Sequence, residues 1–285
     1  MTETTQRVLV AAVGIPLAVG VVFIGGWALA ALLAAIAVLA ALEFYRMAAA
    51  KGALPLRVLG AGIAGLFVVL AAIQPGAGPV SFGTLVTLAI LSIATAAIWT
   101  RGVEGQPLLS ISTTVTGAVY AGLLSFGLFL RHLPGNEGAW HGTALVFAPV
   151  LLTWTSDTFA YFVGRRWGRN KLIPRVSPGK TVEGAIGAVV GSLLVAIAYA
   201  QVLGQFSAYR PTILQAALLG LVISVVAQVG DLAESLLKRD AGVKDSGALL
   251  PGHGGALDRF DSLLFTLPVA YFFLRYWVGP FLVGG

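Results

Sequence analysis

Long apolar runs alternate with short polar or Gly/Pro-rich segments along the whole chain. Several runs carry no charge for 18 or more residues, which is enough for a helix to cross the roughly 30 Å hydrocarbon core of a bilayer. When the chain is divided at these polar or Gly/Pro-rich segments, nine membrane-spanning helices are predicted. They cover residues 8–25, 27–45, 57–73, 82–100, 112–130, 143–163, 182–203, 212–230 and 262–279. The expected fold class is therefore an all-α polytopic membrane protein.

The positions of lysine and arginine predict how these helices are oriented. With a cytoplasmic N-terminus, 15 of the 18 cations fall on cytoplasmic segments, and only Arg131, Arg210 and Arg275 fall outside. One span more or fewer would remove this asymmetry between the two sides. The positive-inside tendency therefore favours a cytoplasmic N-terminus and an outside C-terminus. The two polar segments 164–181 and 231–261 then lie on the same, cytoplasmic side of the membrane.

Composition agrees with this interpretation. A hydrophobic content of 58% with 11% charged residues excludes a soluble globular domain, in which about a quarter of the residues are charged. The net charge of +6 is assigned to orientation and anion binding, not to a nucleic-acid partner. The absence of cysteine excludes disulfides, thiolate chemistry and zinc–thiolate sites. A second apolar run follows the first almost at once, so we expect a retained first span and not a secretion signal.

Three consecutive regions are expected. Residues 1–110 form an N-terminal transmembrane scaffold of about four spans, and residues 111–181 a middle transmembrane region with a basic cytoplasmic loop. Residues 182–285 form a C-terminal transmembrane catalytic region. The first five spans carry few chemically active side chains, so we assign them to scaffold, lipid-facing packing or the surface of a homodimer.

The segment after the eighth span has polar residues at helical spacing. Asp231, Glu234, Ser235, Lys238 and Arg239 share one face if the helix continues past the membrane. This stripe would present a carboxylate first and cations last. The alternative is a solvated amphipathic extension in which Glu234 pairs with Lys238.

A glycine-rich loop follows Lys244 and Asp245. It reads Pro-Gly-His-Gly-Gly over residues 251–255, and its glycines can expose backbone N–H groups to an anion. Such loops are more often simple turns, and His253 by itself is compatible with an ordinary hydrogen-bonded histidine.

Asp258 and Asp261 stand three residues apart at the start of the ninth span. In a helix they point the same way and can grip a magnesium ion, which prefers oxygen ligands. The alternative is that both carboxylates complement the dipole of a helix N-terminus.

Asp157 and Lys180 are the candidates further upstream. Asp157 lies within the sixth span, where an unpaired charge costs about 2.5 kcal/mol or more, so it is either a functional acid or a hydrogen-bonded structural one. The next segment holds six cations, more than orientation needs, and some of them will contact anionic lipid headgroups. Lys180, close to the seventh span, is assigned to a phosphate.

Two blocks of residues together resemble the phosphatidate cytidylyltransferases, also called CDP-diacylglycerol synthases. The first block is Ser235, Lys238, Arg239, Lys244, Asp245, Pro251, His253, Gly254, Gly255, Asp258, Arg259 and Asp261. The second is Asp157, Ala160, Tyr161, Gly164, Arg165, Gly168, Ser177, Pro178, Lys180, Thr181, Glu183 and Gly184. The first five spans match only in hydrophobic character. Ala256 and Arg169 depart from the family pattern, but neither departure removes a group that the chemistry needs.

The resemblance implies that CTP and phosphatidic acid become CDP-diacylglycerol and pyrophosphate at a cytoplasm-facing, magnesium-dependent site in a bacterial cytoplasmic membrane. It implies a magnesium site at Asp231, Asp258 and Asp261, with Asp157 as a weaker candidate and a second ion left open. Lys180, Ser235 and His253 complete the expected catalytic set. The expected substrate-binding residues are Lys238, Arg239, Lys244, Arg259, Gly254 and Gly255.

Two alternative functions belong to other classes. An ion-coupled transporter also uses intramembrane acids, but it would show repeated halves and broken helices near the midplane. Another lipid-pyrophosphate transferase, such as a prenyl transferase, would need two aspartate-rich motifs, and this chain has one Asp-x-x-Asp pair. The longer aspartate, glycine and arginine motif of the alcohol phosphotransferases is absent.

Overall fold

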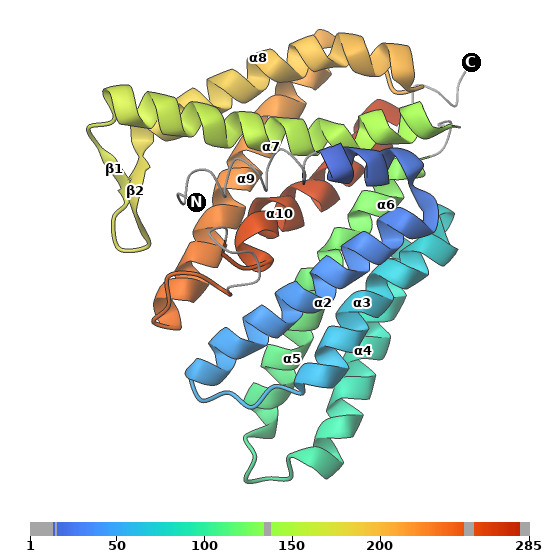
Figure 1. The fold of residues 1–285 in the computed structure, drawn as a ribbon, viewed down its shortest axis with the longest axis vertical. Coiled ribbons are helices and arrows are strands. Elements are labelled where there is room, and N and C mark those ends of the chain that lie inside the picture. The colour runs from blue at the N-terminus through green and yellow to red at the C-terminus, as the bar shows by residue number, and fades with distance from the viewer. Residues whose placement is uncertain (1–13, 15, 134–137, 248–253, 280–285) are drawn as a thin grey trace. The chain divides into compact units, whose positions relative to one another are not determined.

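A computed structural model of the chain describes residue 14 and residues 16–133, 138–247 and 254–279. Over this part of the chain, nine α-helices are labelled α2 to α10, and one two-stranded β-hairpin is present (Figure 1). Six apolar helical segments are long enough to cross a membrane. They are α2 (Gly26–Ala50), α4 (Gly78–Thr100), α5 (Pro107–Gly122) continued by α6 (Phe126–Arg131), α7 (Ala139–Trp167), α8 (Val182–Phe206) and α9 (Ile213–Asp240).

The all-α, multi-span class is thus confirmed, and the number of spans is confirmed in part. The helix α3 (Arg57–Ile73) has the predicted bounds but is only 17 residues long. The predicted ninth span falls on α10 (Leu257–Phe273) and the π-helical turn Leu274–Val278. The predicted first span lies mostly outside the described residues. The count of nine spans and the orientation of the termini stay predictions.

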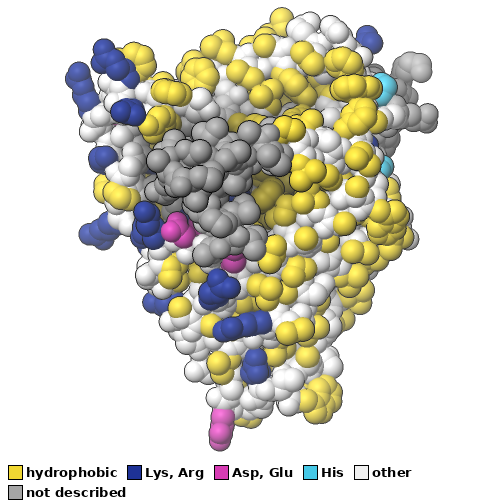
Figure 2. Space-filling view, viewed as in Figure 1, with side chains coloured by type: hydrophobic (Ala, Val, Ile, Leu, Met, Phe, Trp, Pro, Cys, Tyr) yellow, Lys and Arg dark blue, Asp and Glu magenta, His cyan; other side chains and the backbone are white. Residues whose placement is uncertain are grey.

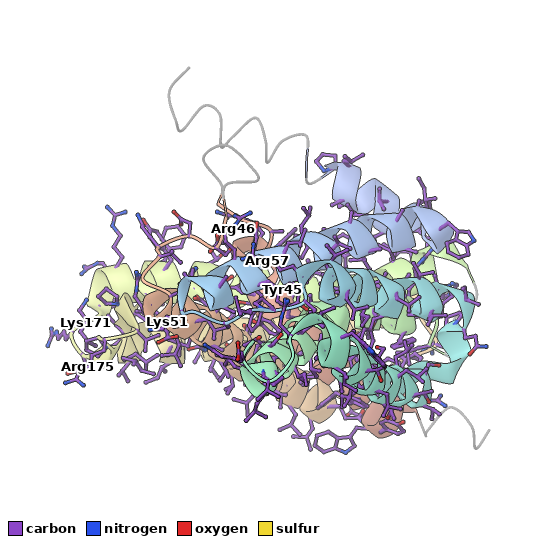
Figure 3. The ribbon with its side chains drawn as sticks, turned by 90° about the horizontal axis from the view of Figure 1, so that it is seen from below. Tyr45, Arg46, Lys51, Arg57, Lys171 and Arg175 are labelled. Carbon is purple, nitrogen blue, oxygen red and sulfur yellow. The ribbon has the colours of Figure 1, made fainter. Side chains whose placement is uncertain are left out.

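The β-hairpin forms the sheet that the structure shows in the described part of the chain. Its strands β1 (Lys171–Ile173) and β2 (Ser177–Thr181) pair antiparallel within the basic segment for which the sequence predicted only a loop. Figure 3 shows Lys171 and Arg175 projecting from the hairpin. Lys171, Arg175 and Lys180 are therefore carried by a defined element, whereas Arg165 and Arg166 lie at the end of α7.

The chain divides into two compact units that interleave along the sequence. The first unit consists of Met1–Phe129 and Leu237–Phe260, and the second of Leu130–Leu236 and Asp261–Gly285. Their boundaries fall within α6, α9 and α10, so each of these helices contributes residues to both units. The three consecutive regions expected from the sequence were drawn by function, and they stay a prediction.

In the first unit, α2, α3 and α5 pack around the side chain of Tyr45 (Figure 3). Tyr45 is fully buried, and its hydroxyl donates to the backbone oxygen of Thr114 at 2.7 Å. The Thr114 hydroxyl oxygen in turn accepts a hydrogen bond from the Leu56 amide at 2.8 Å. Gly60 and Gly117 lie against the Tyr45 ring, where a Cβ atom would overlap it. Small residues therefore let the three helices close around one tyrosine.

Large apolar side chains cover much of the surface visible in Figure 2. On α4, Leu91, Ile98 and Trp99 are all more than half exposed. A soluble protein would avoid such broad apolar surfaces, whereas a helix in a bilayer presents them to lipid. The surface therefore agrees with the assignment of α4 as a membrane span.

In the second unit, α7 and α8 lie side by side along much of their length (Figure 1). Gly187 faces Val163, and Gly191 faces the ring of Phe159, so closely that a Cβ atom at either glycine would overlap the side chain. Small residues at such interfaces let helix backbones approach in the membrane, where the hydrophobic effect does not drive association. Buried hydroxyl groups add polar contacts, because Ser156 Oγ of α7 lies 3.0 Å from Ser224 Oγ of α9.

Candidate functional site

A cavity of about 530 Å³ opens in the second unit between the end of α7, the hairpin, the start of α8 and α9. Its wall carries charges of both signs, which is unusual for a protein of this composition. The polar residues that line it are Asp157, Tyr161, Arg165, Lys171, Ser177, Lys180, Thr181, Gln228 and Asp231. Asp157, Lys180 and Asp231, which the sequence analysis singled out separately, are therefore neighbours in one cavity.

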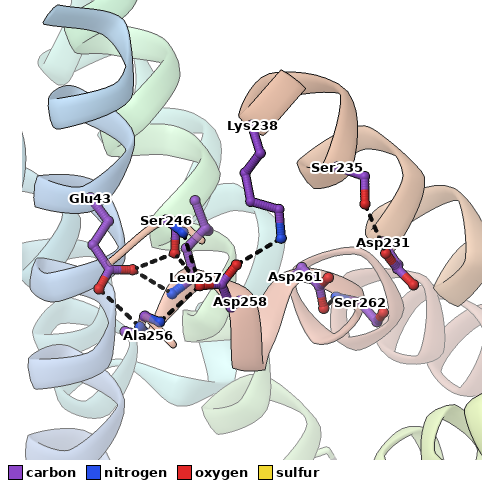
Figure 4. Close-up of polar contacts among 11 residues, drawn as sticks. Glu43, Asp231, Ser235, Lys238, Ser246, Ala256, Leu257, Asp258, Asp261 and Ser262 are labelled. Atoms are coloured by element: carbon purple, nitrogen blue, oxygen red, sulfur yellow. Dashed lines mark hydrogen bonds and ion pairs between the residues drawn. The ribbon is translucent and has the colours of Figure 1, made fainter. Parts of the chain in front are cut away.

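Lys180 and Asp231 form an ion pair across this cavity. The Lys180 Nζ atom on β2 lies 2.8 Å from Asp231 Oδ2 on α9, and both side chains are partly exposed. On its other oxygen, Asp231 accepts a hydrogen bond from the Ser235 hydroxyl at 3.2 Å (Figure 4). Asp157 interacts electrostatically with Asp231, Asp261 and Lys180. One lysine thus balances a group of three carboxylates that repel one another.

The position of Lys180 follows from the start of α8, which comes directly after it. The Thr181 hydroxyl accepts a hydrogen bond from the Gly184 amide at 3.1 Å and caps the helix. The Glu183 carboxylate accepts bonds from the Arg169 and Asn170 amides and from the Asn170 side chain, which ties the far side of the hairpin to the same helix turn. The start of β1 and the end of β2, which pair with each other, are therefore both held to the first turn of α8 by hydrogen bonds.

Gly230 controls the approach of α10 to α9. A Cβ atom at Gly230 would lie 3.0 Å from the backbone oxygen of Asp261 and from Cα of Ser262. Glycine at this position lets the two helices pack closely near Asp231 and Asp261. The association of these two aspartates in one metal site stays a prediction.

The donor set of the second unit suits magnesium in its chemistry. Carboxylate oxygens are the ligands that Mg²⁺ prefers, and a group of three negative charges favours a divalent cation. Over the described residues, no three Asp, Glu or His side chains already stand close enough to hold a metal ion together. The carboxylates of Asp157, Asp231 and Asp261 are therefore suitable ligands whose side chains would have to turn toward a shared ion.

Asp258 belongs to the first unit and has a different environment. Its Oδ1 atom lies 2.7 Å from Lys238 Nζ, and its Oδ2 atom accepts hydrogen bonds from the backbone amides of Ser246 and Gly255 and from the Ser246 hydroxyl (Figure 4). Both side chains of the Lys238–Asp258 pair are largely buried. A metal ion bound to Asp258 would have to share these oxygens or displace their donors.

The helix predicted after the eighth span is present, since α9 continues to Asp240. Glu234 is fully buried and Lys238 contacts Asp258, so a solvated extension is the wrong description of these two residues. Arg239, Lys244 and Arg259 are exposed. Gly254 has a positive φ of 76°, and a Cβ atom there would approach Asp258 Oδ2 at 2.8 Å. His253 and Pro251 lie outside the described residues.

The sequence analysis missed Glu43, which lies on α2 in one of the spans assigned to scaffold. Its carboxylate is 5% exposed and accepts hydrogen bonds from Ser246, Ala256 and Leu257 (Figure 4). The signal that would have found it is the one that identified Asp157, an acid within an otherwise apolar run.

Comparison with known proteins covers nearly the whole chain. A model of the cytidylyltransferase family matches residues 5–277. A phosphatidate cytidylyltransferase of Synechocystis sp. is 37% identical over 95% of this chain and 96% of its own length. The phosphatidate cytidylyltransferase of Haemophilus influenzae is 36% identical over 68% of this chain and 66% of its own length. That of Bacillus subtilis is 47% identical over 47% of this chain and 48% of its own length. The similarity thus extends into the N-terminal spans.

Proposed function

This chain belongs to the cytidylyltransferase family, and from that premise we propose that it transfers the cytidylyl group of CTP to phosphatidic acid, giving CDP-diacylglycerol and pyrophosphate for phospholipid synthesis. The observation that carries the proposal is the charged cavity of about 530 Å³ in which Lys180 and Asp231 form a pair at 2.8 Å. A cavity of this size with lysine and arginine side chains in its wall suits a nucleoside triphosphate.

The reaction is a nucleophilic substitution at phosphorus. A phosphate oxygen of phosphatidic acid forms a bond to the α-phosphorus of CTP, while the bond from that phosphorus to the bridging oxygen breaks and pyrophosphate leaves with the electron pair. Because the attacking oxygen is already anionic, the protein needs no strong general base. Its main task is to bring two polyanions together in line, which requires positive charge and precise orientation.

Cations around the cavity fit this task. Lys180 is placed by β2 and the capped start of α8, and Arg165 and Lys171 line the same cavity. In this proposal these three side chains contact phosphate oxygens. The exposed Arg239, Lys244 and Arg259, together with Lys238, add positive charge for the nucleotide or the lipid headgroup, as the sequence pattern predicts.

Asp231 and Asp261, with Asp157 beside them, are the residues proposed to hold magnesium. A bound magnesium ion would neutralise charge on the triphosphate and stabilise the leaving pyrophosphate. With Asp231 holding the ion, Lys180 would be free to contact a phosphate oxygen in place of the Asp231 carboxylate. Ser235 keeps the Asp231 carboxylate oriented through its hydrogen bond. The predicted role of Asp258 as a further ligand is less well supported, because both of its oxygens accept protein donors.

Localisation and assembly follow from the same proposal. The relatives are bacterial, and the chain contains six helices suited to span a membrane, which supports a bacterial cytoplasmic membrane protein. We place the site on the cytoplasmic side, where CTP is available, and expect a homodimer whose contacts use the N-terminal helices.

A direct assay tests the function. Purified protein, supplied with labelled CTP, phosphatidic acid and Mg²⁺, should yield a chloroform-soluble cytidine product, and chelation of Mg²⁺ by EDTA should stop the reaction. Diacylglycerol in place of phosphatidic acid should give no product, because it lacks the phosphate nucleophile. A wild-type protein that forms no lipid-linked cytidine under these conditions would disprove the proposal.

A pair of variants tests the site. Asp231→Asn should abolish turnover, whereas Asp240→Asn should leave it unchanged. Asp240 lies at the end of the same helix, its side chain is 65% exposed, and it is far along the helix from the cavity. Equal activity of the two variants would contradict the role of Asp231.

A further inference from the structure

Glu43 is an acidic residue buried within α2, one of the helices long and apolar enough to cross a membrane. A carboxylate in such a place is costly unless it is hydrogen-bonded. Here it accepts bonds from the Leu257 amide at 2.8 Å, from the Ala256 amide at 3.0 Å and from the Ser246 hydroxyl at 3.0 Å. Its partners lie more than 200 residues away along the chain, and all belong to the first unit.

One of these donors, the Leu257 amide, is the first amide of α10, and another belongs to Ala256, the residue directly before the helix. The first amides of a helix have no acceptor within the helix, and the helix dipole favours a negative charge beside them. Glu43 therefore caps α10 from another helix. Asp258 accepts from the neighbouring Gly255 amide and from the Ser246 amide, and the single proton of the Ser246 hydroxyl is shared between Asp258 and Glu43, so two carboxylates hold the same turn.

The glycines around this turn fit the same interpretation. A Cβ atom at Gly255 would overlap the Glu43 carboxylate and the Ser246 hydroxyl, and one at Gly247 would overlap the Glu43 carboxylate. Gly255 was expected from the sequence to present its amide to a substrate phosphate. In the structure its amide donates to Asp258 at 2.8 Å, and the missing side chain leaves space for Glu43.

We infer that Glu43 is a positioning residue: its carboxylate fixes Ser246 and the first turn of α10, and thereby sets the orientation of the helix that carries Asp258 and, one turn later, Asp261. This inference rests on the proposed function, since it assigns Glu43 to the same site. The helix α2, which the sequence analysis assigned to the scaffold, then affects the reaction through the contacts of Glu43. Glu43 itself contacts neither substrate nor metal in this assignment.

The test replaces the carboxylate with groups of similar size. Glu43→Gln retains the volume but brings an NH₂ group to face N–H donors, so at least one hydrogen bond is lost. Glu43→Asp retains the charge but shortens the side chain. Glu104→Gln is the matched control, because it makes the same chemical change at an exposed glutamate of the first unit.

Two measurements on the folded, monodisperse fraction of each protein follow. Hydrogen exchange at the amides of 255–258 should become faster in Glu43→Gln, and this readout does not depend on activity. The kcat should fall about 10- to 100-fold, the usual effect of losing a group that orients a ligand, and the Mg²⁺ concentration for half-maximal rate should rise. Glu43→Asp should be closer to the wild type in exchange rate, kcat and Mg²⁺ dependence, and Glu104→Gln should match the wild type in all three.

The possible outcomes separate this inference from the proposed function. Wild-type exchange, kcat and Mg²⁺ dependence in folded Glu43→Gln would overturn the inference while leaving the function intact. A lower yield of folded protein with unchanged kinetics in the folded fraction would also overturn it, because Glu43 would then serve stability alone. An inactive wild type would refute the proposed function, and the exchange data would still decide whether Glu43 holds the turn.

Discussion

Two lysine–aspartate pairs show how the surroundings of a residue decide its role. Lys180 and Asp231 lie 2.8 Å apart in the wall of a cavity, whereas Lys51 and Asp240 lie 3.3 Å apart with more than half of each side chain exposed. An exposed pair contributes about 0–1 kcal/mol to stability because water and salt screen it. The cavity pair is less exposed, and in the proposed function its lysine charge serves to bind a substrate phosphate.

We therefore expect Lys180→Ala to lower kcat/KM about 10- to 100-fold, which corresponds to the roughly 1.5–3 kcal/mol of a hydrogen bond to a charged group. Lys51→Ala is the control and should keep wild-type kinetics. Steady-state rates measured with each substrate varied in turn would show which one the lysine binds. Unchanged apparent affinity for both CTP and phosphatidic acid would remove Lys180 from the site.

The sequence predicted Lys180 and Asp231 but not Glu43, and the reason lies in the range of the contacts. Lys180, Asp231 and Asp258 stand in dense polar segments, where local spacing already suggests chemistry. Glu43 stands alone in an apolar run, and its partners Ser246, Ala256 and Leu257 are brought to it only by the fold. Local patterns also could not show that the Asp258 oxygens accept bonds from Lys238 and nearby amides, and the assignment of Asp258 to the metal site stays a prediction.

At the scale of elements, the lengths of the apolar runs predicted the helices well, but they gave no sign of the short strands. The bounds 57–73 of α3 were predicted correctly, because charged or polar residues mark both of its ends. The hairpin was not predicted, since β1 has three residues and β2 contains Pro178 and Gly179, which disfavour a strand. Its shape depends on Glu183 and Thr181, which bind it to the start of α8 through the contacts that place Lys180.

The packing of α7 against α8 gives a prediction at this scale. Gly191→Val should destabilise the second unit by about 1–3 kcal/mol, because its side chain would overlap the Phe159 ring in a tightly packed interface. Gly83→Ala, in α4, is the control: nothing lies within 4 Å of its Cβ position, so this change should be neutral or slightly stabilising. Thermal unfolding in detergent would compare the two, and equal melting temperatures would show that the close contact is not needed.

At the scale of the whole molecule, each compact unit carries its own group of polar side chains. The cavity with Asp157, Lys180 and Asp231 belongs to the second unit, and the turn held by Glu43 and Asp258 belongs to the first. One unit boundary falls within α9 and another within α10. The orientation of the spans in the membrane, in contrast, was inferred from the distribution of cations alone.

The orientation can be tested because the chain contains no cysteine, so a single introduced thiol is labelled without background. Arg166→Cys and Asp245→Cys place a thiol at exposed positions in the two polar segments, and Gly76→Cys and Arg210→Cys place one on the predicted opposite side. In intact cells, a membrane-impermeant maleimide should label only the latter two, and permeabilisation should make all four reactive. Since CTP is cytoplasmic, labelling of 166 or 245 in intact cells would contradict both the orientation and the proposed access of the nucleotide to the cavity.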